Sequence, residues 1–129
     1  MNVSINISPL KLFFKRPSGT SRGVLKEKNS WIIELVDITD ANRKGVGECS
    51  IIESLSPDWN ESYVKHLSYL ANNPELVNNL DDSWFSDKPS IKFGVEMAIK
   101  DLKTTGKRQF FDTNAFTTGE DGIAINGLI

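Results

Sequence analysis

The chain has 129 residues, of which 39% are hydrophobic and 25% charged, and its formal net charge is −2. This length fits a single domain, and a domain of about 130–150 residues buries roughly two-thirds of its unfolded surface. The composition excludes collagen, low-complexity disorder and a disulfide scaffold. No run reaches the roughly 18 apolar residues that a membrane-spanning helix needs. We therefore expect a globular domain with no membrane and no nucleic acid as partner.

A few residues indicate the cellular location of the protein and the charge of its possible ligand. The first residues lack a basic start followed by an apolar block, which predicts that there is no signal peptide. Cys49 has no second cysteine with which to form a disulfide, and this favours a reducing cytoplasm. Residues 1–30 contain six basic side chains and one acidic one. A basic N-terminal hairpin suits an anionic ligand, although a solvated strand face explains the same pattern.

The first half of the chain predicts strands. Apolar and polar residues alternate from Val3, and the parity changes at Pro9, where we expect a bulge or a sheet edge. The segment 17–23 is rich in glycine and hydroxyl side chains and predicts a loop. Residues 24–38 and 46–52 predict the second and third strands. Consecutive strands with short connections predict a three-stranded antiparallel meander.

The hydrophobic period then becomes helical. Ser56 as N-cap and Pro57 at the first position predict a helix that Asn73-Pro74 ends, followed by a short one to Leu80. The expected apolar face of the first helix consists of Trp59, Tyr63, Leu67 and Leu70.

The strongest helix is predicted for residues 89–103. Asp87 is its expected cap, and Gly106 lies just past its end. Its expected apolar face consists of Ile91, Val95, Ala98, Ile99 and Leu102. Together with the meander, these helices define an α+β class in which a helical bundle follows the sheet.

The last residues of the sequence are apolar. Residues 119–122 predict a turn and 123–129 a buried strand. Because natural termini are usually polar and frayed, we expect this strand to come from a longer protein. The alternative is a C-terminal strand paired in the sheet of a complete chain.

The inventory of chemical groups contains no complete active site. His66 is the one histidine, and the sequence has no zinc-ligand spacing, no phosphate-binding glycine loop and no Gly-x-Ser-x-Gly elbow. We expect Cys49 to be a small core residue, and Glu48 and Glu96 to be structural hydrogen-bonding groups.

Four segments in order resemble the N-terminal capping domain of the enolase superfamily, in its muconate-lactonizing subgroup. They are Thr20-Ser21-Arg22-Gly23, Gly45-Val46-Gly47-Glu48-Cys49-Ser50, the helix motif from Pro89 to Leu102 (Pro-Ser-x-x-Phe-Gly-x-Glu-x-Ala-x-x-Asp-Leu), and Ile125-Asn126-Gly127-Leu128-Ile129. The last segment resembles the first barrel strand of o-succinylbenzoate synthases.

The resemblance implies a two-domain enzyme. Residues 1–121 would form the cap, and residues 122–129 would begin a TIM-type (β/α) barrel, whose active site lies at the carboxyl ends of its strands. In that superfamily the lysines that move protons and the carboxylates that hold Mg²⁺ lie on the barrel. The resemblance therefore implies Mg²⁺ in the full-length enzyme, and neither catalytic residues nor metal ligands within this sequence.

The resemblance also implies that the cap supplies specificity through two loops, at about 18–23 and 51–56. The residues expected near the substrate are Gly19, Thr20, Ser21, Arg22, Ile51, Ser54 and Leu55. The hydroxyls and the guanidinium suit a carboxylate. Arg22 would equally cover apolar surface or pair with an acid on the sheet. The mixture of apolar and hydroxyl groups in 51–56 suits the ring of a substrate.

Three functions remain open from the sequence. The segment Asn126-Gly127-Leu128 favours the cap of an o-succinylbenzoate synthase, a lyase of menaquinone biosynthesis with a dicarboxylate substrate. The cap of a dipeptide epimerase or N-acylamino-acid racemase is the close alternative. A stand-alone α+β ligand-binding or interaction module is the third. If the barrel is absent, Ile123, Ile125, Leu128 and Ile129 should be exposed and should favour self-association.

Overall fold

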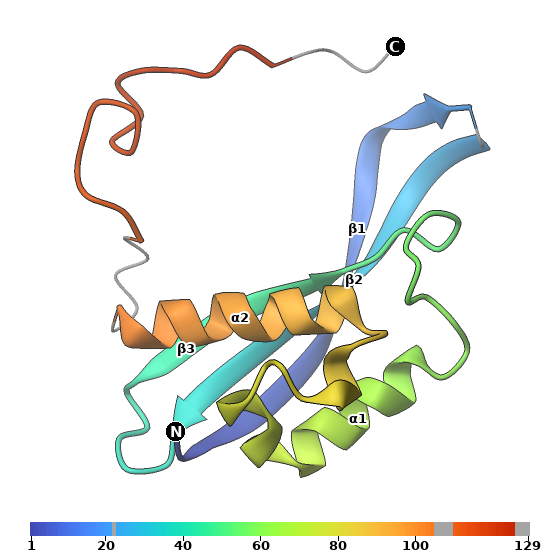
Figure 1. Cartoon of the computed structure of the whole chain (residues 1–129). Coiled ribbons are helices and arrows are strands. Elements are labelled where there is room, and N and C mark those ends of the chain that lie inside the picture. Colours follow the sequence, from blue (N-terminus) through green and yellow to red (C-terminus); the bar gives the residue numbers. More distant parts are fainter. Residues whose placement is uncertain (22, 105–109, 126–129) are drawn as a thin grey trace.

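The computed structural model of the chain describes residues 1–21, 23–104 and 110–125 (Figure 1). Within these residues the sheet comes first and the helices follow. The elements are β1 (Val3–Thr20), β2 (Gly23–Asp37), β3 (Lys44–Ser50), α1 (Tyr63–Asn72), the 3-10 helices η1 (Pro74–Asn78) and η2 (Ser83–Phe85), and α2 (Pro89–Lys103). This confirms the predicted α+β class.

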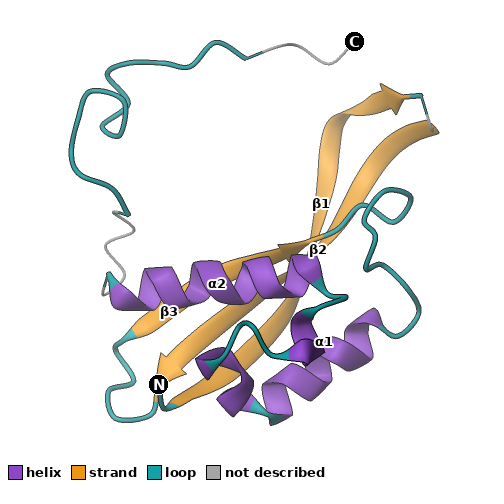
Figure 2. Ribbon diagram, viewed as in Figure 1, coloured by secondary structure: helices purple, strands orange, loops and turns teal. Residues whose placement is uncertain are grey.

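The sheet is an antiparallel meander in the order β1-β2-β3. Both α-helices lie on one of its faces (Figure 2). Because β3 pairs with β2 only between Ser30 and Val36, the rest of β1 and β2 extends past the sheet as a two-stranded ribbon. We refer to residues 10–29, without the undescribed position 22, as the ribbon.

The predicted loop at 17–23 is wrong. β1 continues to Thr20, which pairs with Gly23, so the connection is a tight turn at the tip of the ribbon. Gly23 has a φ of 138°, which is a conformation that residues with a side chain rarely adopt. Glycine and proline are poor strand formers, but here backbone pairing with β2 outweighs that propensity.

The register is continuous at Pro9, which lies opposite Trp31, and the irregularity falls later, between Phe13 and Ser18. The predicted edge position is confirmed, since β1 is an edge strand and tolerates a proline there. The change of parity has another cause. The register places Leu10 and Leu12 on the face opposite to Val3 and Ile5, so the ribbon and the sheet have different apolar faces.

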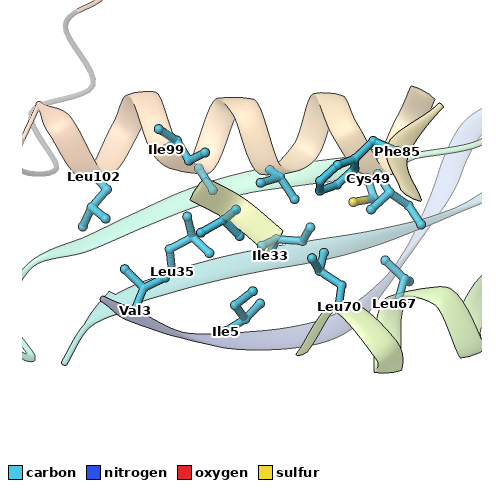
Figure 3. Close-up of a cluster of buried hydrophobic side chains, with 14 of the residues drawn as sticks. Val3, Ile5, Ile33, Leu35, Cys49, Leu67, Leu70, Phe85, Ile99 and Leu102 are labelled. Atoms are coloured by element: carbon cyan, nitrogen blue, oxygen red, sulfur yellow. The ribbon is translucent and has the colours of Figure 1, made fainter. Parts of the chain in front are cut away.

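The core lies between the sheet and the helices (Figure 3). Ile33, Leu35 and Cys49 contribute the sheet side and are fully buried. On the helical side Tyr63, Leu67, Leu70, Ile91, Val95, Ala98, Ile99 and Leu102 are all buried, which confirms the predicted faces except at Trp59, which is half-buried and lies in the loop before α1. Each fully buried aliphatic or aromatic side chain contributes about 1.5–3 kcal/mol, so this layer is the main stabilising feature of the domain.

Close packing of α2 on β3 accounts for both glycine-containing motifs. A Cβ atom on Gly47 would overlap the carbonyl oxygen of Gly94, and a Cβ on Gly94 would lie 2.6 Å from the Sγ atom of Cys49. Asp101, near the end of α2, accepts a 2.8 Å hydrogen bond from the backbone N–H of Val46. The two motifs therefore act as matching halves of one helix–strand contact.

The predicted start of the first helix is wrong, because α1 begins at Tyr63 and residues 51–62 form a loop. The Ser56 hydroxyl accepts a 2.8 Å hydrogen bond from the N–H of Ile52, so it closes a turn behind itself instead of capping a helix ahead. The end of α1 at Asn72 and the helical turn from Pro74 confirm the predicted stop.

The bounds of α2 are those predicted, but Asp87 is not its cap. Asp87 pairs instead with the Lys88 ammonium, which keeps the pKa of Asp87 below its ordinary value. A carboxylate from the loop after β3, that of Asp58, binds the first turn of α2. Gly106 lies outside the described residues.

Residues 110–125 contain no strand. Ile123 and Ile125 are 67% and 88% exposed, so the predicted buried strand is wrong for its described part, where the backbone has no neighbouring strand with which to pair. Residues 126–129 of that prediction lie outside the described residues. In the described part of the chain, no helix combines the length and apolarity that crossing a membrane requires.

Candidate functional site

The candidate site residues fall on two segments. Gly19 and Ser21 lie at the tip of the ribbon, where Gly19 pairs with Val24 in the ladder. Arg22 lies outside the described residues, and only the backbone of Thr20 is described. In the loop after β3, Ser54 and Leu55 are exposed, whereas Ile51 is 1% exposed and belongs to the core.

A pocket of about 170 Å³ lies where this loop meets the ribbon. Its walls are formed by Phe14, Leu25, Glu27, Lys28 and Asn29 of the ribbon and by Ile51, Ile52, Glu53 and Ser54 of the loop. The structure thus brings two of the predicted residues, Ile51 and Ser54, against the base of the ribbon. Gly19 and Ser21, the predicted residues described at the ribbon tip, are not among the residues that line this pocket.

The ribbon residues of the pocket were missed because their position depends on register. Leu25, Glu27 and Asn29 alternate along β2 and therefore share one face. The alternation is visible in the sequence, but the sequence does not show that residues 51–54 of the loop after β3 pack against that face. Phe14 is 40% exposed and Leu25 half-buried, so the pocket has an apolar side beside its charged groups.

The charges at the base of the ribbon are largely paired. Lys11 binds Glu27 at 2.9 Å, and Lys28 lies 3.6 Å from Glu48. Glu48 also accepts a 2.7 Å hydrogen bond from Ser30, which agrees with its expected structural role. Glu53 accepts a 2.9 Å hydrogen bond from the uncharged amide of Asn29, and this couples the loop to the ribbon.

Basic groups accumulate toward the tip. Lys15, Arg16 and Lys26 are exposed and have no ion pair within the described residues. Exposed cations on one end of a narrow ribbon create a positive potential that attracts anions. The described part of the ribbon therefore has a basic end and a base whose charges are mostly neutralised.

The buried titratable groups near the site are structural. Burial raises the pKa of the Cys49 thiol to about 12, so this thiol is protonated at neutral pH and is a poor nucleophile. Burial also raises the pKa of Tyr63, whose hydroxyl lies 2.6 Å from that of Ser90.

Two further titratable residues lie outside the pocket. Glu96 forms an exposed ion pair with Lys100 at 3.4 Å, and His66 is half-buried beside the ring of Trp84.

A Mg²⁺ site needs several oxygen ligands held in near-octahedral geometry. Across residues 1–21, 23–104 and 110–125, no three His, Cys, Asp or Glu side chains are grouped so that they could hold a metal ion. The described residues therefore do not fit a bound Mg²⁺ ion.

The meander, with α2 lying on β3 and the ribbon projecting beyond the helices, is a fold that occurs as one part of longer solved epimerases. The chain is similar in sequence to the o-succinylbenzoate synthase of Desulfotalea psychrophila (strain LSv54 / DSM 12343). The two are 34% identical over 149 aligned positions, which cover 92% of this chain and 39% of the relative. The chain thus spans about two-fifths of the length of the curated relative that it matches.

Solved structures support the fold assignment. The dipeptide epimerase from Cytophaga hutchinsonii, complexed with Mg and D-Ala-L-Val, superposes with a TM-score of 0.67 at 21% identity, over 80% of this chain and 30% of that one. The L-Ala-D/L-Glu epimerase from Bacillus subtilis superposes with a TM-score of 0.60 at 20% identity, over 78% and 30%. At these identities the likeness shows the fold alone. No family model matches the sequence.

Proposed function

We propose that this chain is the capping and specificity domain of an o-succinylbenzoate synthase-like lyase, a cytoplasmic enzyme that dehydrates a cyclohexadiene carboxylate in menaquinone biosynthesis. The sequence identity of 34% over 92% of the chain is the observation that carries the proposal. The capping-domain fold supports it.

In this proposal the chemistry belongs to a barrel domain outside the described residues. That domain, which would begin at residue 122, would supply the proton-transferring lysines and the carboxylates that hold Mg²⁺, as the resemblance implies. The chain described here would bind and enclose the substrate. Catalysis by the chain alone is not expected, since the proton-transferring lysines and the metal ligands would lie on the barrel.

The ribbon and the loop after β3 would act as the two sides of a lid. The basic tip of the ribbon would attract the dicarboxylate, and Arg22, Thr20 and Ser21 would contact one carboxylate. Ser54 and Leu55 would approach the ring from the other side. Closure of these segments would exclude water from the barrel mouth.

A second candidate is the cap of a dipeptide epimerase. The pocket supplies the observation that favours it, because its walls contain the carboxylates of Glu27 and Glu53 and a single cation, Lys28. Within the described residues Glu27 pairs with Lys11, whereas Glu53 is bonded to a neutral amide, so Glu53 is the carboxylate that suits the ammonium group of a peptide. The two candidates therefore differ in which end of the ribbon contacts the ligand.

A chimera tests the proposal. This chain would replace the matching N-terminal part of the Desulfotalea psychrophila relative, and the purified chimera would be assayed for dehydration of the cyclohexadiene substrate and for epimerisation of dipeptides. We expect dehydration without epimerisation. The relative with its own cap is the control. A folded chimera that epimerises dipeptides would support the second candidate, and one that turns over neither substrate would contradict both.

A further inference from the structure

The loop after β3 contains a pre-formed turn over residues 52–56. The N–H groups of Leu55 and Ser56 both donate to the carbonyl oxygen of Ile52 at 2.8 Å. The Ser56 hydroxyl accepts a hydrogen bond from the N–H of Ile52, also at 2.8 Å. All of these bonds lie within the turn. They give it a shape, but they do not fix where it stands relative to the ribbon.

Asp58 attaches this turn to the helical layer. Asp58 is only 5% exposed, and its Oδ2 atom accepts hydrogen bonds from the N–H and the hydroxyl of Ser90, at 2.9 and 2.5 Å. The same Ser90 hydroxyl lies 2.6 Å from the hydroxyl of Tyr63. The loop, α1 and the first turn of α2 thus meet at one oxygen atom. The partial positive charge at the N-terminus of α2 favours the carboxylate there.

The attachment on the ribbon side is weaker. Asn29 donates to Glu53 in an exposed position, where water competes for both groups. Trp59, which directly follows Asp58, stacks on Trp31 of β2 with ring centroids 6.1 Å apart. The backbone position of Asp58 therefore determines how Trp59 meets β2 and how the turn meets the pocket.

We propose that Asp58 is a positioning residue that sets the place of the 52–56 turn over the pocket, with Ser90 as its partner. The second carboxylate oxygen of Asp58 is buried and has no hydrogen-bond partner among the described residues. Such a group is costly, and the two bonds to Ser90 offset that cost only while the loop stays in place. The effect on ligand binding rests on the proposed function, whereas the placement of the turn does not.

Fluorine NMR of the 129-residue chain labelled with 5-fluorotryptophan tests this placement without any ligand. The three labelled positions are Trp31, Trp59 and Trp84. We expect Asp58→Ala and Ser90→Ala to move the Trp59 resonance toward the position of free fluorotryptophan. The Trp84 resonance should move less than that of Trp59, because its ring contacts are with His66, Tyr69, Phe85 and Lys88, none of which belongs to the loop. Ser90→Thr keeps the hydroxyl and should restore the Trp59 signal.

The result that overturns the proposal is a folded variant whose Trp59 resonance does not move while its unfolding midpoint falls, since Asp58 would then only cap α2. If Asp58→Ala does not fold, Ser90→Ala decides by the same criterion, because it keeps the backbone N–H bond to Asp58. An inactive chimera would contradict the proposed function and would leave this measurement unaffected.

Discussion

Gly94→Ala is the most informative perturbation of the helix–strand contact. In an exposed helix interior, alanine is more favourable than glycine by about 1 kcal/mol. Here the new Cβ would lie 2.6 Å from Cys49 Sγ and 3.1 Å from the backbone N of Cys49, and backbone cannot rotate away. Overpacking costs typically about 1–3 kcal/mol, and contact with backbone places this case at the upper end. We therefore expect a net loss of about 2 kcal/mol.

Urea unfolding followed by tryptophan fluorescence measures this loss as a lower midpoint at an unchanged slope. Gly19→Ala is the matched control, since no atom lies within 4 Å of its Cβ position, and it should change stability by less than about 0.5 kcal/mol. In a Cys49→Ala background the cost of Gly94→Ala should fall by about 1 kcal/mol, because the sulfur is gone. A Gly94→Ala protein as stable as the wild type would refute the reasoning.

Three further predictions each concern one side chain. Asp101→Ala should cost about 1.5–3 kcal/mol in urea unfolding, because the part-buried N–H of Val46 loses its carboxylate acceptor; an unchanged midpoint would contradict this. Cys49 should resist a thiol reagent at pH 8 until the protein unfolds, since its pKa is raised to about 12, and rapid labelling of the native state would disprove its burial. The pKa of Asp37 should lie below 3.8, chiefly because of the hydrogen bond from the Thr39 hydroxyl, and NMR titration of Thr39→Val should show it rising. This contribution to stability is present at neutral pH and is lost as the pH falls through the folded-state pKa.

Periodicity predicted the elements whose burial is one-sided. The bounds of α2 and the buried faces of both helices follow from spacing alone, because each helix has a single apolar stripe that must face the sheet. The second strand follows from its density of β-branched and aromatic residues. Spacing does not explain the glycines of β3 and α2. They are needed because the backbones of these two elements approach each other closely.

The sequence-based predictions were wrong where a hydrogen-bonding side chain could serve either of two backbone segments. Ser56 before a proline is typical of a helix start, yet its hydroxyl binds Ile52 behind it, and the helix begins later. Asp87 lies where a cap is expected, but Asp58, distant in sequence, binds the first turn of α2. The pocket depends on the pairing of β1 with β2 and on how the loop folds across the ribbon, and neither is visible in residue order.

If the proposed function is right, this chain contributes substrate binding and not chemistry, and Arg22→Ala in the chimera should show this in steady-state kinetics. A guanidinium–carboxylate contact that is equal in the ground and transition states raises KM when it is removed. The loss of a hydrogen bond to a charged group costs about 1.5–3 kcal/mol, so KM should rise about ten- to a hundredfold while kcat stays close to its original value. Arg22→Lys should recover only part of the affinity, since an ammonium cannot form two parallel bonds. A kcat that falls a thousandfold at an unchanged KM would contradict the account.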